Sequence, residues 1–161
     1  MPEPRVAASY VHLLYEYLEG AGLDARALLG PEPPADDHFV PLPRWQQLLS
    51  LAAQADPRPG LPLRIARHIS PRHFGVVGYA ALACATLADA LLRMERYHVS
   101  VYDVNPAVVR HVPEGISIEW GVSRERPGAL VDETAIASLV QLARDMTGRY
   151  WPVAEVSFVN P

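Results

Sequence analysis

The feature that most constrains the fold is a run of 14 uncharged residues, from Gly75 to Ala88, which reads GVVGYAALACATLA. A run this apolar could cross a membrane, line a pocket or lie in a protein core. A transmembrane helix needs about 20 apolar residues, and charged residues follow this shorter run at once, beginning with Asp89 and Arg93. The sequence therefore predicts that the run belongs to the core of a domain and does not span a membrane.

The composition agrees with one globular domain. The chain has 161 residues, half of them hydrophobic and a fifth charged, which suits one domain with a core of its own. The formal charge of −4 shows no basic excess of the kind that holds DNA phosphates. Cys84 is the single cysteine, and the first 20 residues lack the pattern of a signal peptide. We therefore predict a cytoplasmic protein.

The first 70 residues show the periodicity of helices separated by proline-rich and glycine-rich connections. Apolar residues recur there at spacings of three, four and seven. Asp24 has the position of an N-cap, and Pro43 lies in a first helical turn, where proline is favoured. The expected helices cover residues 5–19, 24–30, 41–55 and 60–69.

The uncharged run itself divides into two helices at Thr86. Gly78 to Cys84 is expected to form a short, very apolar, buried helix. Thr86 then has the position of an N-cap for a second helix, with Asp89 in the capping-box position. The second helix is expected to be amphipathic, with an apolar face made of Leu87, Ala90, Leu91, Met94, Tyr97, His98 and Val101.

The periodicity changes to two residues after Pro106. Residues 107–112 and 115–122 predict the two strands of a hairpin joined by a short turn. The residues expected to share one face of the second strand are Ile116, Ile118, Trp120 and Val122. Helices followed by a hairpin, a helix and a final strand predict an α+β fold, in which several helices pack on a small, mostly antiparallel sheet.

The last 30 residues predict one helix and one strand. The helix is expected over 132–148, with Asp132 as its N-cap and Gly148 as its end. Its expected inner face comprises Ile136, Leu139, Val140, Ala143 and Met146. The closing VAEVSFVNP predicts a strand with Ala154, Val156 and Phe158 directed inward.

The sequence lacks the motifs of the common enzyme and metal-binding classes. It contains no GxGxxG, GxxxxGK[ST], GxSxG or HExxH motif. One cysteine and six widely spaced histidines do not give the spacing of a metal site, and Cys84 lies in the most apolar segment, where a thiol is inert. We therefore expect no metal, no cofactor and no catalytic residue, while a small enzyme built from scattered histidines and carboxylates stays an alternative.

Two groups of residues are candidates for contacts with a ligand. The stretch RIARHISPRHF holds five basic side chains within ten residues. It predicts an anion site for an effector, a docking face for another domain or, more simply, a solvated basic helix end. Aromatic residues near the uncharged run either line a pocket between helix and sheet or belong to a plain core. The candidate ligand-binding residues are Arg72, His73, Phe74, Tyr79, Tyr97 and Trp120.

The central part of the chain resembles a known family of regulators. The pattern consists of PLPRW at the start of a helix, the pairs Asp56-Pro57 and Gly60-Leu61, the GxxGY of residues 75–79, TLADAL, Arg96-Tyr97 and the closing WPVAEVSFVNP. It resembles the N-terminal effector-binding domain of AraC/XylS transcriptional regulators, in the branch called arabinose-binding. The resemblance extends over about residues 5–161 and rests on hydrophobic and turn positions.

The resemblance implies a regulatory domain and no enzymatic activity. Residues 1–161 would form one effector-sensing and dimerisation domain, with the small-molecule effector unknown and a homodimer as one expected assembly. DNA would be bound through a C-terminal helix-turn-helix half that is absent here. The resemblance supplies no pocket residues, and a structural dimerisation module without a ligand stays an alternative. We expect the site between the helices at 75–101 and the hairpin at 107–122, with the basic stretch at its mouth.

Overall fold

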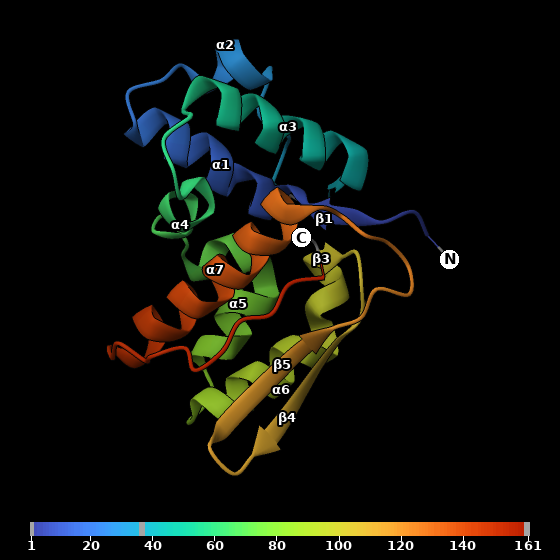
Figure 1. Ribbon diagram of the computed structural model, residues 1–161, viewed down its shortest axis with the longest axis vertical. Helices are drawn as coiled ribbons and strands as arrows, with labels where there is room; N and C mark the ends of the chain where they lie inside the picture. Colours follow the sequence, from blue (N-terminus) through green and yellow to red (C-terminus); the bar gives the residue numbers. More distant parts are fainter. Residues whose placement is uncertain (1, 36–37, 160–161) are drawn as a thin grey trace.

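A computed structural model describes residues 2–35 and 38–159 of the protein. Helix α1 (Ala8–Gly20) is packed among the other N-terminal helices (Figure 1). Its apolar stripe is buried as the periodicity predicts, and its members, Tyr10, Leu13, Leu14, Tyr17 and Leu18, are each at most 3% exposed. Helices α2 (Ala25–Leu29), α3 (Leu42–Ala55) and α4 (Leu61–Ala66) pack against α1. The four helices expected in this part are confirmed, with somewhat different ends.

The ends of these helices follow from local chemistry. The Asp24 carboxylate accepts a hydrogen bond of 2.9 Å from the backbone N–H of Ala27, as an N-cap should. Pro43 lies in the first turn of α3, where its missing N–H leaves no bond unmade. The part of the expected loop PEPPADD at residues 36–37 lies outside the described residues.

Three short strands form a sheet that the periodicity did not reveal. Strand β1 (Arg5–Ala7) pairs antiparallel with β2 (Phe39–Pro41) on one side and with β3 (Tyr102–Asp103) on the other. The expectation of helix from Arg5 onward is therefore wrong for the first three residues. These residues are extended because their backbone groups find partners in segments far away along the chain.

The uncharged run begins after a 3₁₀ turn, η1 (Pro71–Phe74), and forms α5 (Gly75–Leu82). At Gly78 a side chain has no room, because a Cβ there would lie 1.9 Å from the backbone oxygen of Pro71. The short apolar helix is confirmed, but the expectation that it is buried holds for one side only. Val76 is 85% exposed and Tyr79 59%, so only one side of α5 faces the core.

Helix α6 (Leu87–Tyr97) is capped and amphipathic as predicted. The Thr86 hydroxyl accepts a hydrogen bond of 3.1 Å from the backbone N–H of Asp89 and donates one of 2.8 Å to its carboxylate. Ala90, Leu91 and Met94 form the buried face. Tyr97 is the exception on the expected apolar face, since it is 47% exposed.

The predicted hairpin is confirmed. Strands β4 (Ala107–Val112) and β5 (Gly115–Trp120) pair antiparallel, with Val109 opposite Ile118. Exposed and partly buried residues alternate along β5, as a strand with one covered face should show. Neither strand joins the three-stranded sheet. The hairpin leans on α6, which lies behind it in Figure 1.

Helix α7 (Ala129–Thr147) lies between the N-terminal helices and the hairpin (Figure 1). It starts three residues before the expected cap, so the assignment of Asp132 as N-cap is wrong and Gly128 holds that position. Gly148 ends it with φ of 63°, as predicted. The expected inner face is also shifted, since the most buried residues are Val131, Thr134, Ser138 and Leu142.

The last described segment, residues 151–159, has no strand partner, so the predicted final strand is wrong. Its side chains are exposed, including Val156 and Phe158 at 45% each. Where the segment leaves α7, Arg144 donates hydrogen bonds of 3.1 and 2.9 Å to the backbone oxygen of Trp151. The alternation of apolar residues had predicted a strand, but no neighbouring strand supplies the hydrogen bonds.

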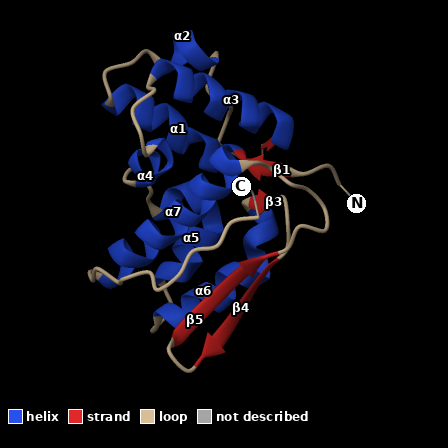
Figure 2. Cartoon of the chain, in the orientation of Figure 1, coloured by secondary structure: helices blue, strands red, loops and turns tan. Residues whose placement is uncertain are grey.

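The predicted α+β class is confirmed (Figure 2). Helices dominate the described chain, and two small antiparallel sheets replace the expected single one. Among the described residues, no helix is both long and apolar enough to cross a membrane.

Candidate functional site

A cavity of about 70 Å³ lies where α1, α6, α7 and the β4–β5 hairpin meet. We call it the helix–hairpin cavity. A single water needs about 10–15 Å³ by a comparable measure, so the cavity has room for several waters. Its lining residues are Tyr10, Phe74, Val77, Leu91, Met94, Glu95, His98, Val101, Tyr102, Ala107, Val109, Ile118, Trp120, Ala135 and Leu139.

The walls follow from the periodicity of each element. Leu91, Met94 and Glu95 project from successive turns of α6. Ile118 and Trp120 project from the covered face of β5, two residues apart. The surface that the cavity presents to a ligand is therefore mostly hydrocarbon, with a few polar atoms among it.

Tyr10, one of the lining residues, has a buried hydroxyl without a hydrogen-bond partner. The side chain is 2% exposed, and its oxygen makes no hydrogen bond. Ser138 is close enough to favour the ionised phenol slightly, but the two hydroxyls do not meet hydrogen-bond geometry. Burial outweighs this effect and raises the pKa of Tyr10. The phenol is thus a neutral donor without an acceptor, which is costly in a protein interior.

His98 is the second polar group with an unused atom. Its Nδ1 lies 2.7 Å from the backbone oxygen of Glu95, so Nδ1 carries the proton and donates. In the neutral ring Nε2 is then an acceptor, and this buried atom has no partner. The Glu95 carboxylate accepts a hydrogen bond of 3.1 Å from the backbone N–H of Val109, which ties α6 to β4.

Tyr102 completes the polar lining. Its ring meets that of Tyr10 edge to face at 6.3 Å. Burial raises the pKa of Tyr102 well above its ordinary value, and the charge of Asp132 adds to the rise. Both tyrosines therefore remain neutral. Among the described residues, Glu95 is the one side chain of Asp, Glu, Arg or Lys type in the lining.

The six residues predicted from the sequence do not gather at one place. Phe74 and Trp120 line the helix–hairpin cavity. Tyr79 is 59% exposed and lines neither hollow. Tyr97, Arg72 and Phe74 line a second, open groove across α5 and α6. The structure thus places two of the six at the cavity, and the role of all six in binding stays a prediction.

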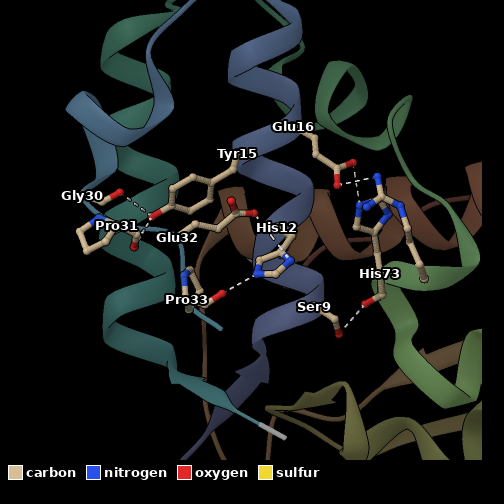
Figure 3. A network of polar contacts seen from close by, with 10 residues as sticks. Ser9, His12, Tyr15, Glu16, Gly30, Pro31, Glu32, Pro33 and His73 are labelled. Carbon is tan, nitrogen blue, oxygen red and sulfur yellow. Dashed lines mark hydrogen bonds and ion pairs between the residues drawn. The ribbon is translucent and has the colours of Figure 1, made fainter. Parts of the chain in front are cut away.

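The basic pair Arg72 and His73 contacts α1 instead of the helix–hairpin cavity. Arg72 lies 2.7 Å from one oxygen of Glu16, and His73 Nε2 lies 2.9 Å from the other. The Glu16–His73 contact and the bond from the Ser9 hydroxyl to the backbone oxygen of His73 are drawn in Figure 3. This polar cluster pins η1 to α1.

A histidine beside a carboxylate at this distance can form a general base, but His73 cannot act in that way here. The residue is 1% exposed. Its Nε2 donates to Glu16, and its Nδ1 accepts a hydrogen bond of 2.9 Å from the backbone N–H of Ser70. Neither ring nitrogen is free for a substrate. Burial is the main cause that lowers the pKa of His73, and the bond from Ser70 requires the neutral ring.

Sequence reasoning missed Tyr10 and His98 as site residues. Both were assigned to apolar helix faces, and this is where they lie. Their special property is an unpaired polar atom, which depends on neighbours far away in the sequence, such as Trp45 at 5.5 Å and Tyr102 at 6.3 Å from the Tyr10 ring. No local signal in the sequence marks such an atom.

Comparison with known proteins identifies the family. No curated protein matches the chain. Residues 14–161 match a family model described as the arabinose-binding domain of AraC transcription regulators, N-terminal. This is a regulatory ligand-binding domain and not a known class of enzyme. Among residues 2–35 and 38–159, no group of three or more His, Cys, Asp or Glu side chains could hold a metal ion. The match extends over nearly the whole chain, and the protein therefore belongs to the family of N-terminal ligand-binding domains of AraC-type transcription regulators.

Proposed function

We propose that this domain binds a small effector in the helix–hairpin cavity and passes the signal to a linked DNA-binding half in the cytoplasm. The observation that carries the proposal is the Tyr10 hydroxyl, buried at an apolar cavity without a hydrogen-bond partner. A buried polar group of this kind is stabilised when a ligand supplies the missing partner. The family of the chain, a regulatory ligand-binding domain, supports the same function.

The size of the cavity suggests how binding could change the domain. A cavity of about 150 Å³ accepts benzene, whereas this one has about 70 Å³. A ligand of that size must therefore separate the walls. The hairpin is the wall most able to move, because neither of its strands pairs with the other sheet. The Glu95–Val109 bond is one of its ties to α6.

The linkage to the DNA-binding half then follows from thermodynamics. A ligand shifts an equilibrium between two arrangements only by the difference in its affinity for them. An expanded cavity with a displaced hairpin would be the arrangement that binds effector more tightly. We propose that the DNA-binding half responds to the position of the hairpin and of α7, whose Ala135 and Leu139 line the same cavity.

Thermal unfolding against a broad panel of metabolites tests the proposal. Ligand at 100 times its dissociation constant should stabilise the protein by about 2.7 kcal/mol. Ala135→Leu should abolish that shift because the new side chain fills the cavity. Ala137→Leu, on α7 but outside the lining, is the matched control and should keep it. If no compound in the panel shifts the transition, and none copurifies with the protein in mass spectrometry, the proposal is wrong.

Hydrogen exchange then locates the site. Bound effector should change the exchange rates at β4, β5 and α6, because displacement of the hairpin alters the exposure of these amides. Exchange in α2, which is remote from the cavity lining, should stay the same. Slowing confined to the groove across α5 and α6 would move the site to that groove, which Arg72 and Tyr97 line.

One observation favours the second candidate, a dimerisation module without ligand. Helix α5 is apolar on all sides, yet Val76, Tyr79 and Leu82 are 85%, 59% and 50% exposed. An exposed apolar surface often marks a contact between proteins. Sedimentation at micromolar concentration decides: a dimer that is lost in Val76→Asp and is indifferent to every metabolite would support this candidate.

A further inference from the structure

We infer that the effector of the helix–hairpin cavity is a neutral, mostly apolar molecule with a single hydroxyl-type group, and neither a free sugar nor an anion. This inference rests on the proposed function of the cavity and adds the chemical class of its ligand. Three features of the lining carry it: the hydrocarbon walls, the absence of a cationic Arg or Lys, and the polar atoms of Tyr10 and His98.

The walls exclude a sugar. A pentose carries a polar group on nearly every carbon, and each one needs a hydrogen-bond partner when it leaves water. The cavity offers hydrocarbon from Val77, Leu91, Met94, Ile118 and Leu139. Among the described lining residues, the fully buried polar atoms without a hydrogen-bond partner are Tyr10 Oη and His98 Nε2, and Tyr102 and Trp120 add one hydroxyl and one indole N–H. Several hydroxyl groups of a bound pentose would therefore still face carbon.

The charges of the lining exclude an anion. In the part of the chain that the structure describes, no arginine or lysine lines the cavity, and the lining contains the acidic residue Glu95. Basic side chains that neighbour lining residues in the sequence are engaged elsewhere: Arg72 and His73 contact Glu16. Arg93 and Arg96 line the groove across α5 and α6, and Arg110 pairs with Glu119. A carboxylate or phosphate would lose its hydration without meeting a cation, next to a charge of its own sign.

The two unpaired atoms match a hydroxyl group. Tyr10 is neutral because burial raises its pKa, so its hydroxyl donates. His98 donates from Nδ1 to the backbone oxygen of Glu95, which leaves Nε2 as an acceptor. A hydroxyl group accepts and donates at one atom. It can therefore satisfy Tyr10, His98 or both, while the rest of the ligand contacts the apolar walls.

Four small probes of known chemistry test this inference: phenol, toluene, benzoate and L-arabinose. Phenol and toluene have nearly the same shape and differ in the hydroxyl group. We expect phenol to bind about tenfold more tightly than toluene, the factor for one added buried hydrogen bond. Benzoate and L-arabinose should bind at least tenfold more weakly than phenol. Isothermal titration with the purified protein gives each dissociation constant.

Tyr10→Phe tests the role of the hydroxyl. The variant should weaken phenol about tenfold and leave toluene unchanged. Tyr15→Phe is the matched control on the same helix, because the Tyr15 hydroxyl donates to the backbone oxygens of Gly30 and Pro31 away from the cavity (Figure 3). It should bind both probes as the original protein does. Native-like circular dichroism of both variants ensures that a loss of affinity is not a loss of fold.

The possible results separate this inference from the proposed function. Tighter binding of benzoate or L-arabinose, abolished by Ala135→Leu, would overturn the neutral class and retain the cavity as an effector site. Equal affinity for phenol and toluene, unaffected by Tyr10→Phe, would overturn the requirement for a hydroxyl group. No binding by any of the four probes, together with no shift in the metabolite panel, would overturn both.

Discussion

The N-terminal helices and the helix–hairpin region bury their apolar residues to very different degrees. In residues 5–69, large side chains from three helices, such as Leu14, Trp45 and Ile65, have no exposed surface. In residues 75–122, Val76, Tyr79 and Leu82 are at least half exposed, and Val108 and Val112 on the hairpin are 38% and 39% exposed. The first region is a closely packed core, whereas the second leaves many large apolar side chains exposed to solvent.

This difference indicates a division of work. Dense packing around α1 holds the backbone in one arrangement, because displacing any buried side chain opens a void. The helix–hairpin region has a cavity and an isolated two-stranded sheet, so local movement there costs less. A domain that must respond to a small molecule needs both: a fixed platform and a part that moves against it.

The largest expected effect is on the stability of the platform. Leu49 on α3 is completely buried, and Leu49→Ala should lower the free energy of unfolding by about 2–5 kcal/mol. Ile118 lines the cavity and is half-buried, so Ile118→Ala should cost only about 1 kcal/mol. Urea unfolding of both variants measures the two losses. Equal losses would contradict the distinction between the two regions.

The second effect concerns a polar anchor of the platform. Asp56 accepts hydrogen bonds from the Tyr17 hydroxyl and, at 2.6 Å each, from two nitrogens of Arg58. These partners hold the pKa of Asp56 well below its usual range. The stabilisation is present above the ordinary carboxyl pKa of about 3.8 and is lost as the pH falls through the lowered one.

Asp56→Asn should therefore destabilise the protein at neutral pH and flatten the decline of stability below about pH 4. Urea unfolding between about pH 2.5 and 7 measures this, because that range brackets the ordinary aspartate pKa of about 3.8. Asp24→Asn is the control, since asparagine is as good an N-cap as aspartate. An unchanged profile for Asp56→Asn would show that the anchor contributes nothing.

The third effect is a pH dependence at the junction of the two regions. His73 joins η1 to α1 in its neutral form, facing Glu16 and Arg72, and its folded pKa is lowered. As the pH falls below about 6.5, His73 is therefore protonated in the unfolded chain before it is protonated in the folded one. The contribution of neutral His73 is thus present above that pH and is lost below it, with a slope of at most about 1.4 kcal/mol per pH unit.

The free energy of unfolding, measured at several pH values between about 5 and 8, checks this expectation. That range brackets the ordinary histidine pKa of about 6.5. His73→Gln should remove the slope. His111→Gln, an exposed position on β4, should keep it. A slope of opposite sign would mean that the charged ring is the favoured partner of Glu16.

The smallest effect is expected at the cavity itself. Tyr10→Phe removes a buried hydroxyl that has no partner, so the free protein should lose no stability and gain up to about 1 kcal/mol. Tyr15→Phe on the same helix removes two hydrogen bonds and should cost about 1 kcal/mol. Thermal unfolding without ligand compares them. A clear loss in Tyr10→Phe would show that the hydroxyl already has a partner in solution.

The sequence predicted the elements whose signal is local. Helix α6 carries an N-cap at Thr86 and an apolar face, and the hairpin carries a period of two, so both could be placed from neighbouring residues alone. Strand β1 has three residues, and its pairing with Val40 and Tyr102 depends on segments far apart in the sequence. The prediction of a final strand was wrong for the opposite reason. Its apolar alternation is a local signal, but no described strand pairs with it.

The candidate site was predictable in outline only. The helices at 75–101 and the hairpin at 107–122 supply most of the cavity lining, as the order of elements suggested. The basic stretch was expected at the mouth, but Glu16, 57 positions before His73, takes up two of its members. Periodicity places a side chain on a face of an element; it does not show which distant residue will meet it.

The position of one cavity wall depends on residue 78 being a glycine. Helix α5 rests on the Pro71 carbonyl because residue 78 contributes only a hydrogen there. Val77, one position earlier, forms part of the cavity wall. A single methyl group at residue 78 would collide with the Pro71 carbonyl and would displace α5, together with Val77, from the turn before it. The shape of the helix–hairpin cavity thus depends, in part, on the absence of a side chain at residue 78.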